Sequence, residues 1–186
     1  MIEEYLINHC SPTLASIKTA NLINVPFDSF EQLKASVERM NDILAAKGVK
    51  LLILKRSEKT ALVYVVRLKL LERDLQRDGV ADFLLDYGYM SSDADYCLSR
   101  LKMRLNGCDS FPHEIGIFLG YPLGDVIGFI ENAGQNSLCS GCWKVYCNEC
   151  EAMKTFSKYE HCKKIYNKLW LQGRSIARLA VAVQKG

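Results

Sequence analysis

Four of the eight cysteines fall into two CxxC pairs that lie close together in the chain. They are Cys139 with Cys142 and Cys147 with Cys150. Each pair can chelate an ion, and four thiolates suit Zn²⁺ or an iron–sulfur cluster. The residues between the pairs, 143–146, favour an extended strand of roughly 13 Å, so a shared ion needs a tight chain reversal. The sequence therefore leaves open a metal site, separate thiols, or a redox-active pair that lacks a thioredoxin-like setting.

A second group of reactive residues consists of two dipeptides, His9-Cys10 and His113-Glu114. A histidine beside a thiol can lower the pKa of the thiol and create a nucleophile. An enzyme that uses Cys10 or His113 is therefore one hypothesis, although a histidine in the first turn of a helix more often caps it or packs in a core. A ligand pocket is the other hypothesis, and its candidate residues are His9, Cys10, His113, Glu114, Tyr121 and Trp143.

The C-terminal part of the chain is basic. Residues 154–186 contain eight Lys or Arg and one acidic residue, Glu160. A helix, a turn at Gly173 and a short second helix are similar to a helix-turn-helix. The second helix is apolar, however, with only Arg174 and Arg178 able to reach a nucleic acid. We expect a packing helix, and the net charge of +3 does not argue for nucleic-acid binding.

Composition indicates the broad class and the compartment. The 186 residues are 49% hydrophobic and 24% charged, which is typical of a globular protein. No apolar run reaches the roughly 18 residues that span a bilayer. The N-terminus is acidic where a secretory signal would be basic. We expect a cytoplasmic protein with reduced cysteines and no membrane partner.

Hydrophobic spacing predicts the elements of the first half. Short helices are expected over residues 2–8 and 13–23, separated by a break before Pro12. A longer helix begins near Ser29, which can cap it, and ends at Gly48. Residues 49–54 and 60–68 then form dense apolar runs, which predict a β-hairpin that is buried on both faces and extended or covered by other elements.

The second half is predicted to be mainly helical. Residues 69–106 are interrupted near Gly79 and Gly88, and Asp93 can cap the last helix of this stretch. Two helices, 112–119 and 123–132, are expected to meet at a rigid Gly-Tyr-Pro corner, with His113 and Asp125 near the resulting surface. An extended segment over 143–146 precedes a long helix over 151–172. The expected fold class is α+β: a mainly helical single domain, residues 1–186, around a small antiparallel β-hairpin or sheet, in which residues 151–186 could form a C-terminal helical lobe.

Three segments carry a resemblance to a known family. They are HCSPTLASIKTANL, FPHEIGIFLGYPLGDVIGFIENAG and CWKVY. They resemble a family of proteins from anaerobic bacteria that is catalogued as domain of unknown function 3793. The resemblance implies an intact single protein in a reducing cytoplasm and implies no activity. Cys147 and Cys150 depart from the family pattern, so a four-cysteine site would be peculiar to this protein.

The sequence therefore predicts an accessory or binding protein with a ligand or metal site within residues 111–150. The alternatives are an enzyme and, less favoured, a nucleic-acid-binding protein. An open pocket that contains both Cys10 and His113 would favour the enzyme.

Overall fold

The computed structural model describes residues 2–107 and 110–182. The fold is α+β and mostly helical, which confirms the predicted class. The chain divides into two compact units. The terminal unit contains the residues up to Leu71 and those from Cys162 onward, and the central unit contains Glu72–His161. The second part of the expected C-terminal lobe therefore clusters with the N-terminal residues. Among the described helices, none has the length and apolar character needed to cross a membrane.

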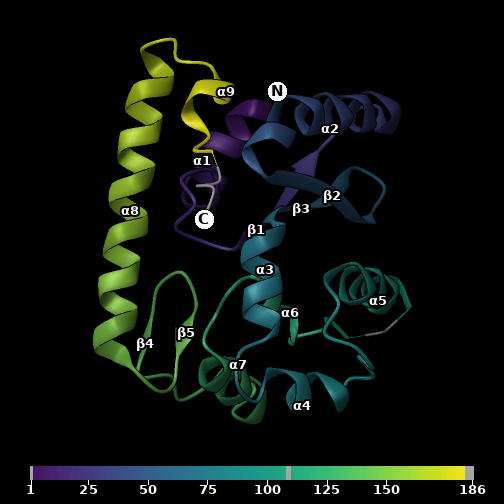
Figure 1. The fold of residues 1–186 in the computed structure, drawn as a ribbon, viewed down its shortest axis with the longest axis vertical. Helices are drawn as coiled ribbons and strands as arrows, with labels where there is room; N and C mark the ends of the chain where they lie inside the picture. The colour runs from purple at the N-terminus through teal and green to yellow at the C-terminus, as the bar shows by residue number, and fades with distance from the viewer. Residues whose placement is uncertain (1, 108–109, 183–186) are drawn as a thin grey trace. The chain divides into compact units, whose positions relative to one another are not determined.

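The terminal unit is built on a three-stranded antiparallel sheet of order β1-β3-β2 (Figure 1). The predicted hairpin is confirmed as β2 (Val49–Arg56) and β3 (Thr60–Arg67), and β1 (Ala20–Pro26) extends it. Every residue of β3 from Val63 to Arg67 is buried, as expected for a central strand with both faces covered. In β2, by contrast, exposed and buried positions are mixed, because it lies at an edge of the sheet.

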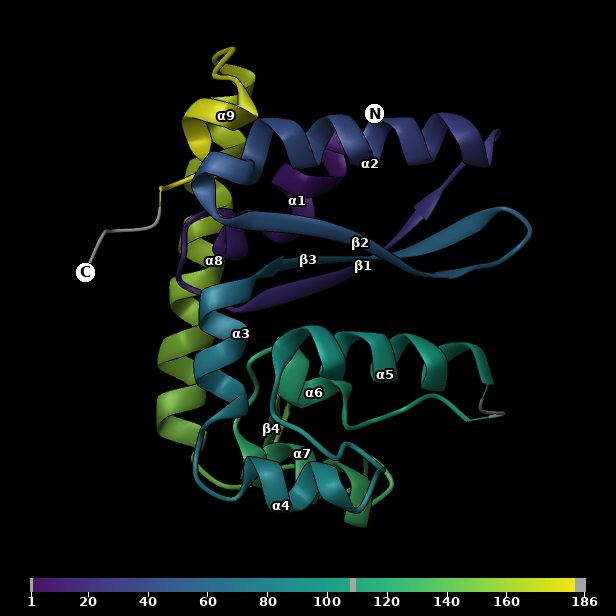
Figure 2. The same cartoon turned by 45° about the vertical axis from the view of Figure 1, so that its right-hand side comes forward.

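Two helices, α1 (Ile2–Leu14) and α2 (Phe30–Leu44), cover the same face of this sheet, as Figure 2 shows. The predicted cap of α2 is confirmed, because the amide of Gln32 donates to Ser29 Oγ. A short turn, η1 (Ala45–Lys47), follows α2 and ends at Gly48, whose φ of 68° favours glycine. Alternate β3 residues join the core under these helices, together with residues of α8 and α9 that belong to the terminal unit: Ala61, Val63, Val65, Cys162, Tyr166, Ile176 and Leu179.

Two predictions for the N-terminal segment are wrong. The helix α1 does not break before Pro12 but continues to Leu14. A proline inside a helix costs about 3 kcal/mol, whereas each fully buried leucine contributes about 1.5–3 kcal/mol, and Leu6 and Leu14 are both fully buried. Residues 13–23 do not form a second helix, because a turn at Ser16 (φ 61°) leads into β1, whose pairing with β3 outweighs local propensity.

The first helices of the central unit follow the prediction. The boundary between the two units falls within α3 (Leu68–Leu75). The helices α4 (Val80–Leu85) and α5 (Ala94–Gly107) follow in the central unit. The two predicted interruptions are confirmed at Gly79 (φ 76°) and Gly88 (φ 79°). The predicted cap is confirmed too, since Asp93 Oδ1 accepts from the amide of Tyr96.

The predicted corner is also confirmed. It joins α6 (Ile115–Phe118) to α7 (Leu123–Glu131), and Gly120 turns there with φ of 78°. The first helix is shorter than expected because the chain enters it through a turn, in which the amide of Ile115 donates to the carbonyl of Pro112.

A two-stranded antiparallel hairpin, β4 (Cys139–Ser140) and β5 (Lys144–Val145), completes the central unit between α7 and the first half of α8 (Glu149–Leu171) (Figure 1). Gly173 follows α8, and Ser175 holds the N-cap position of α9 (Ile176–Leu179).

Candidate functional site

A pocket of about 310 Å³ opens in the central unit between α6, α7 and the β4–β5 hairpin. Its volume is at the small end of the range of ligand pockets, roughly 300–1,000 Å³. Most of its wall is apolar or aromatic, and a few polar side chains interrupt it. The lining residues are His113, Ile115, Gly116, Leu119, Tyr121, Asp125, Val126, Phe129, Ser140, Gly141, Trp143 and Lys144.

The alternation of the hairpin decides which of its side chains face the pocket. Ser140 and Lys144 are cross-strand partners and both line the pocket. Cys139 and Val145 form the neighbouring pair, and residues one step along a strand point to the opposite face. Val145 is accordingly buried in a small core with Ala152 and Phe156, against which Cys139 packs. The face with Ser140 and Lys144 therefore belongs to the pocket, the face with Cys139 and Val145 belongs to this core, and Trp143 contacts both.

Asp125 joins α7 to the segment that includes β5. Its Oδ2 accepts from the indole Nε1 of Trp143 at 2.7 Å. Its Oδ1 accepts from the amides of Tyr146 (2.7 Å) and Cys147 (3.0 Å) and from the thiol of Cys147 (2.9 Å). The side chain is only 3% exposed, so the expectation that it lies near the surface is wrong. The carboxylate instead fixes the hairpin on α7.

These contacts control the ionisation of Asp125 and Cys147 in opposite directions. Burial raises the pKa of Asp125, but the hydrogen bonds from Cys147, Tyr146 and Trp143 outweigh it and hold that pKa below the ordinary value. Burial and the neighbouring carboxylate raise the pKa of the Cys147 thiol. The pair therefore stays as carboxylate and protonated thiol around neutral pH.

Two glycines on α7 allow this close packing. A Cβ on Gly128 would lie 2.5 Å from Cβ and Cγ of Tyr146, and a Cβ on Gly124 would lie 2.9 Å from Sγ of Cys147. Because the two glycines are four residues apart, they share one face of the helix. Neither glycine has a side chain to keep the Tyr146–Cys147 backbone away, so this backbone comes within hydrogen-bonding distance of Asp125.

Stacked aromatic rings form part of the pocket wall. The rings of Tyr121 and Trp143 lie 4.9 Å apart at 28°, and Phe156 packs edge-on against Trp143 at 4.6 Å. The Tyr121 hydroxyl donates to the carbonyl of Cys142, and burial raises the pKa of Tyr121 to about 12. Tyr121 is thus tied to the hairpin and Trp143 to Asp125 of α7, so both polar groups help to fix this wall.

Three of the predicted pocket residues, His113, Tyr121 and Trp143, line this pocket. Glu114 does not. It is 1% exposed, and its Oε1 accepts from Arg104 Nε at 2.5 Å and from the hydroxyl of Tyr89 at 3.1 Å. Burial and Glu114 raise the pKa of Tyr89, so that hydroxyl remains a donor. Glu114 therefore belongs to a buried ion pair of the central unit.

His9 and Cys10 lie on α1 in the terminal unit, and neither lines the pocket. Cys10 is fully buried, and burial raises its pKa to about 12, although Lys18 and Lys163 oppose the shift. Such a thiol is protonated at neutral pH, which does not favour Cys10 as a nucleophile. The ring of His9 lies 6.0 Å from that of Tyr5. His9 and Cys10 therefore belong to one compact unit and His113 to the other.

The chain reverses within the first CxxC pair rather than between the two pairs. Because Ser140 pairs with Lys144, the turn of the hairpin contains Cys142. Cys139 and Cys142 pack against the small core, whereas Cys147 and Cys150 are exposed. None of the seven cysteines in the described part of the chain forms a disulfide, and Cys108 lies outside it.

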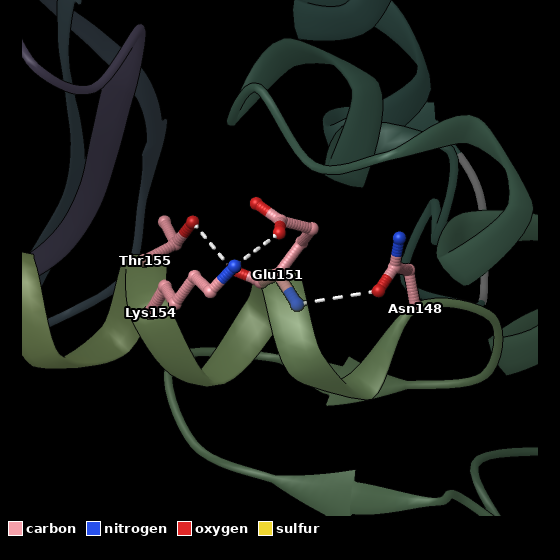
Figure 3. A network of polar contacts seen from close by, with 4 residues as sticks. All are labelled: Asn148, Glu151, Lys154 and Thr155. Carbon is pink, nitrogen blue, oxygen red and sulfur yellow. Dashed lines mark hydrogen bonds and ion pairs between the residues drawn. The ribbon is translucent and has the colours of Figure 1, made fainter.

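Cys147 and Cys150 flank the start of α8, where Asn148 Oδ1 accepts from the amide of Glu151 (Figure 3). Within residues 2–107 and 110–182, no three His, Cys, Asp or Glu side chains are grouped so that they could hold a metal ion. The metal site stays a prediction, tested by zinc analysis and visible absorption of protein purified without oxygen.

Sequence reasoning missed several residues of the pocket. The sequence analysis places Asp125 only near the surface of the Gly-Tyr-Pro corner, and it does not indicate Lys144, Phe129 or Ser140. Two signals could have found some of them. Gly124 and Gly128 indicate a bare helix face beside Asp125, and the alternation of a short hairpin pairs Ser140 with Lys144.

The model of a family described as "Protein of unknown function (DUF3793)" matches residues 6–180. No curated protein and no solved structure matches the chain.

Proposed function

Because the chain belongs to the DUF3793 family, whose description gives no activity, we propose a function from the pocket itself. The protein binds a small molecule between α6, α7 and the β4–β5 hairpin, and it acts as an accessory or binding protein. The cysteines of the described residues form no disulfide, which fits the reducing cytoplasm in which we place the protein.

The observation that carries this proposal is the way the pocket wall is held. A buried charge is unfavourable unless it is fully hydrogen-bonded, and Asp125 receives four hydrogen bonds, all from the hairpin segment Trp143–Cys147. In the stacked pair of rings, Tyr121 donates to the carbonyl of Cys142 and Trp143 donates to Asp125. A pocket with a largely apolar wall and preset polar groups is typical of ligand sites.

Binding is favoured over catalysis by the groups available. The pocket lining contains no cysteine, and its carboxylate is occupied by donors from the hairpin. His113 does line the pocket, so an enzyme that uses His113 as a base is the second candidate. Turnover of a bound molecule that disappears in His113→Gln would favour the enzyme.

A fragment screen by ligand-observed NMR tests the proposal. Ser140 is exposed and lines the pocket, so Ser140→Trp should block the opening and abolish binding. Ser137→Trp, three residues earlier and outside the pocket lining, is the matched control and should bind normally. Trp170→Phe leaves Trp143 as the only tryptophan, whose fluorescence should change on binding. Fragments that bind equally well to Ser140→Trp would overturn the proposed site.

A further inference from the structure

The polar groups of the pocket are not equally available to a ligand. A carboxylate offers about four lone-pair sites, and the two oxygens of Asp125 already accept four hydrogen bonds. A cationic ligand would have to displace donors that hold the hairpin in place. Asp125 therefore stabilises the pocket wall, and the other polar side chains of the pocket are the ones available to bind a ligand.

Those side chains are hydrogen-bond donors. Lys144 is half-buried, and its Nζ donates to the carbonyl of Gly134. An ammonium group has three N–H donors, so two are left. Within the described part of the chain Lys144 makes no ion pair. A half-buried ammonium with spare donors and no carboxylate partner is a site for an anion.

His113 and Lys144 both line the pocket, and each can be placed relative to Phe129. The rings of His113 and Phe129 are 5.0 Å apart. A Cβ on Gly134 would lie 3.1 Å from the ring of Phe129 and 3.7 Å from Nζ of Lys144. The imidazole and the ammonium therefore both lie near the Phe129 ring, and the Tyr121–Trp143 stack also lines the cavity.

We infer that the ligand is a small aromatic or apolar carboxylate. Its carboxylate accepts hydrogen bonds from Lys144 and from a ring N–H of His113, and its apolar body packs among Phe129, Leu119 and the Tyr121–Trp143 wall. This inference rests on the proposed function, because it names the chemical class of the molecule in the same pocket.

Three probes of one size separate the charge classes: 3-phenylpropanoate, 3-phenylpropanamide and 3-phenylpropylamine. Titrations followed by NMR or calorimetry should show that the propanoate binds at least about tenfold more tightly than the amide, since a charge-assisted hydrogen bond is about twice as strong as a neutral one. Lys144→Gln should remove this preference, whereas Lys144→Arg should keep it. Added salt should weaken binding of the propanoate more than binding of the amide.

Equal binding of the three probes, tightest binding of the amine, or a preference that survives in folded Lys144→Gln would overturn the inference. If Lys144→Gln does not fold, the comparison of the three probes on the unmodified protein decides alone. Failure of all three probes also overturns it. In these cases the proposed function still stands if other fragments bind and Ser140→Trp excludes them, so the two failures are distinguishable.

Discussion

At the scale of single residues, Asp125 is the group that most affects the candidate site. One buried carboxylate binds the indole of Trp143, two successive amides and a thiol. Hydrogen bonds to a charged acceptor contribute about 1.5–3 kcal/mol each, about twice the value for neutral pairs. The position and ionisation of this side chain therefore decide whether the pocket wall is ordered.

Asp125→Asn should lower the free energy of unfolding by about 2–3 kcal/mol, because an amide nitrogen would face groups that are themselves donors. Hydrogen exchange at the amides of Tyr146 and Cys147 should become faster. Glu131→Gln, an exposed change on the same helix, is the control and should be neutral. Unchanged exchange at the two amides in Asp125→Asn would contradict the assigned role.

The pH dependence follows from the depressed pKa of Asp125. The folded pKa is below the unfolded value of about 3.9, so the stabilisation is present above that pH and is lost as pH falls through the folded pKa. The difference in melting temperature between the unmodified protein and Asp125→Asn should be constant near neutral pH and shrink below about pH 4. A difference that grows in acid would show the opposite sign and refute the assignment.

Thiol reactivity should not follow exposure alone. Cys147 and Cys150 are both exposed, but burial of the sulfur and Asp125 raise the pKa of Cys147. Iodoacetamide labelling followed by mass spectrometry should therefore modify Cys150 before Cys147, and Asp125→Asn should accelerate Cys147. The buried thiols should react only after unfolding, since burial raises their pKa values to about 11 or 12: Cys10, Cys97 and Cys162. Faster labelling of Cys147 than of Cys150 would be the contrary result.

At the scale of elements, the contact between α7 and the segment after β5 shows that close packing can outweigh helix propensity. Alanine is about 1 kcal/mol better than glycine inside a helix. Gly128 nevertheless lies against the base of the Tyr146 side chain, where a Cβ would come within 2.5 Å. Tyr146 cannot move aside easily, because its amide is bound to Asp125.

Gly128→Ala should therefore destabilise the protein by about 1–3 kcal/mol, since overpacking costs more than the gain in propensity. Gly107→Ala is the matched control. It is also helical, nothing lies within 4 Å of its built Cβ, and it should be neutral or stabilising. Equal melting temperatures for Gly128→Ala and the unmodified protein would argue against the close approach.

The central strand allows a harsher test of the sheet. Val65 is fully buried in β3, and an unpaired buried carboxylate is strongly unfavourable. Val65→Asp should abolish folding, as measured by soluble yield and circular dichroism. Lys50→Asp, at an exposed position of β2, should fold. Soluble Val65→Asp with an unchanged melting temperature would place the strand outside the core.

At the scale of the whole molecule, the terminal unit is joined by one buried arginine. Arg67 is 2% exposed and donates to four carbonyls, from Thr13, Leu14, Lys47 and Val181. Three of these lie at or just beyond the ends of α1 and η1, where carbonyls lack helical partners. Segments distant in sequence thus share one guanidinium.

Arg67→Met should lower the free energy of unfolding by about 3 kcal/mol or more, because it leaves buried carbonyls without donors. Arg67→Lys should rescue little, since an ammonium has three donors and no planar fork. Arg56→Met, at an exposed position, is the control. Full stability of Arg67→Lys, measured by chemical denaturation, would contradict the need for the guanidinium geometry.

Some features of the fold follow from the sequence alone because they are local. Helix α2 has its periodicity, its Ser29 cap and its terminal Gly48 within twenty residues, and the corner at Gly120 depends on a glycine and Pro122. The apolar runs of β2 and β3 predict the central hairpin for the same reason. In each case the deciding interaction lies between residues close in the chain.

Tertiary contacts decided the rest. The strand β1 and the passage of α1 through Pro12 depend on partners more than thirty residues away, which outweigh local propensity. The same holds for the candidate site. The sequence indicated the region 111–150 through His113, Tyr121 and Trp143, but which face of the hairpin meets the pocket was set by Asp125 and the bare face of α7. That choice put the Cys139–Val145 pair against the core and the Ser140–Lys144 pair in the pocket, because neighbours along a strand point to opposite sides.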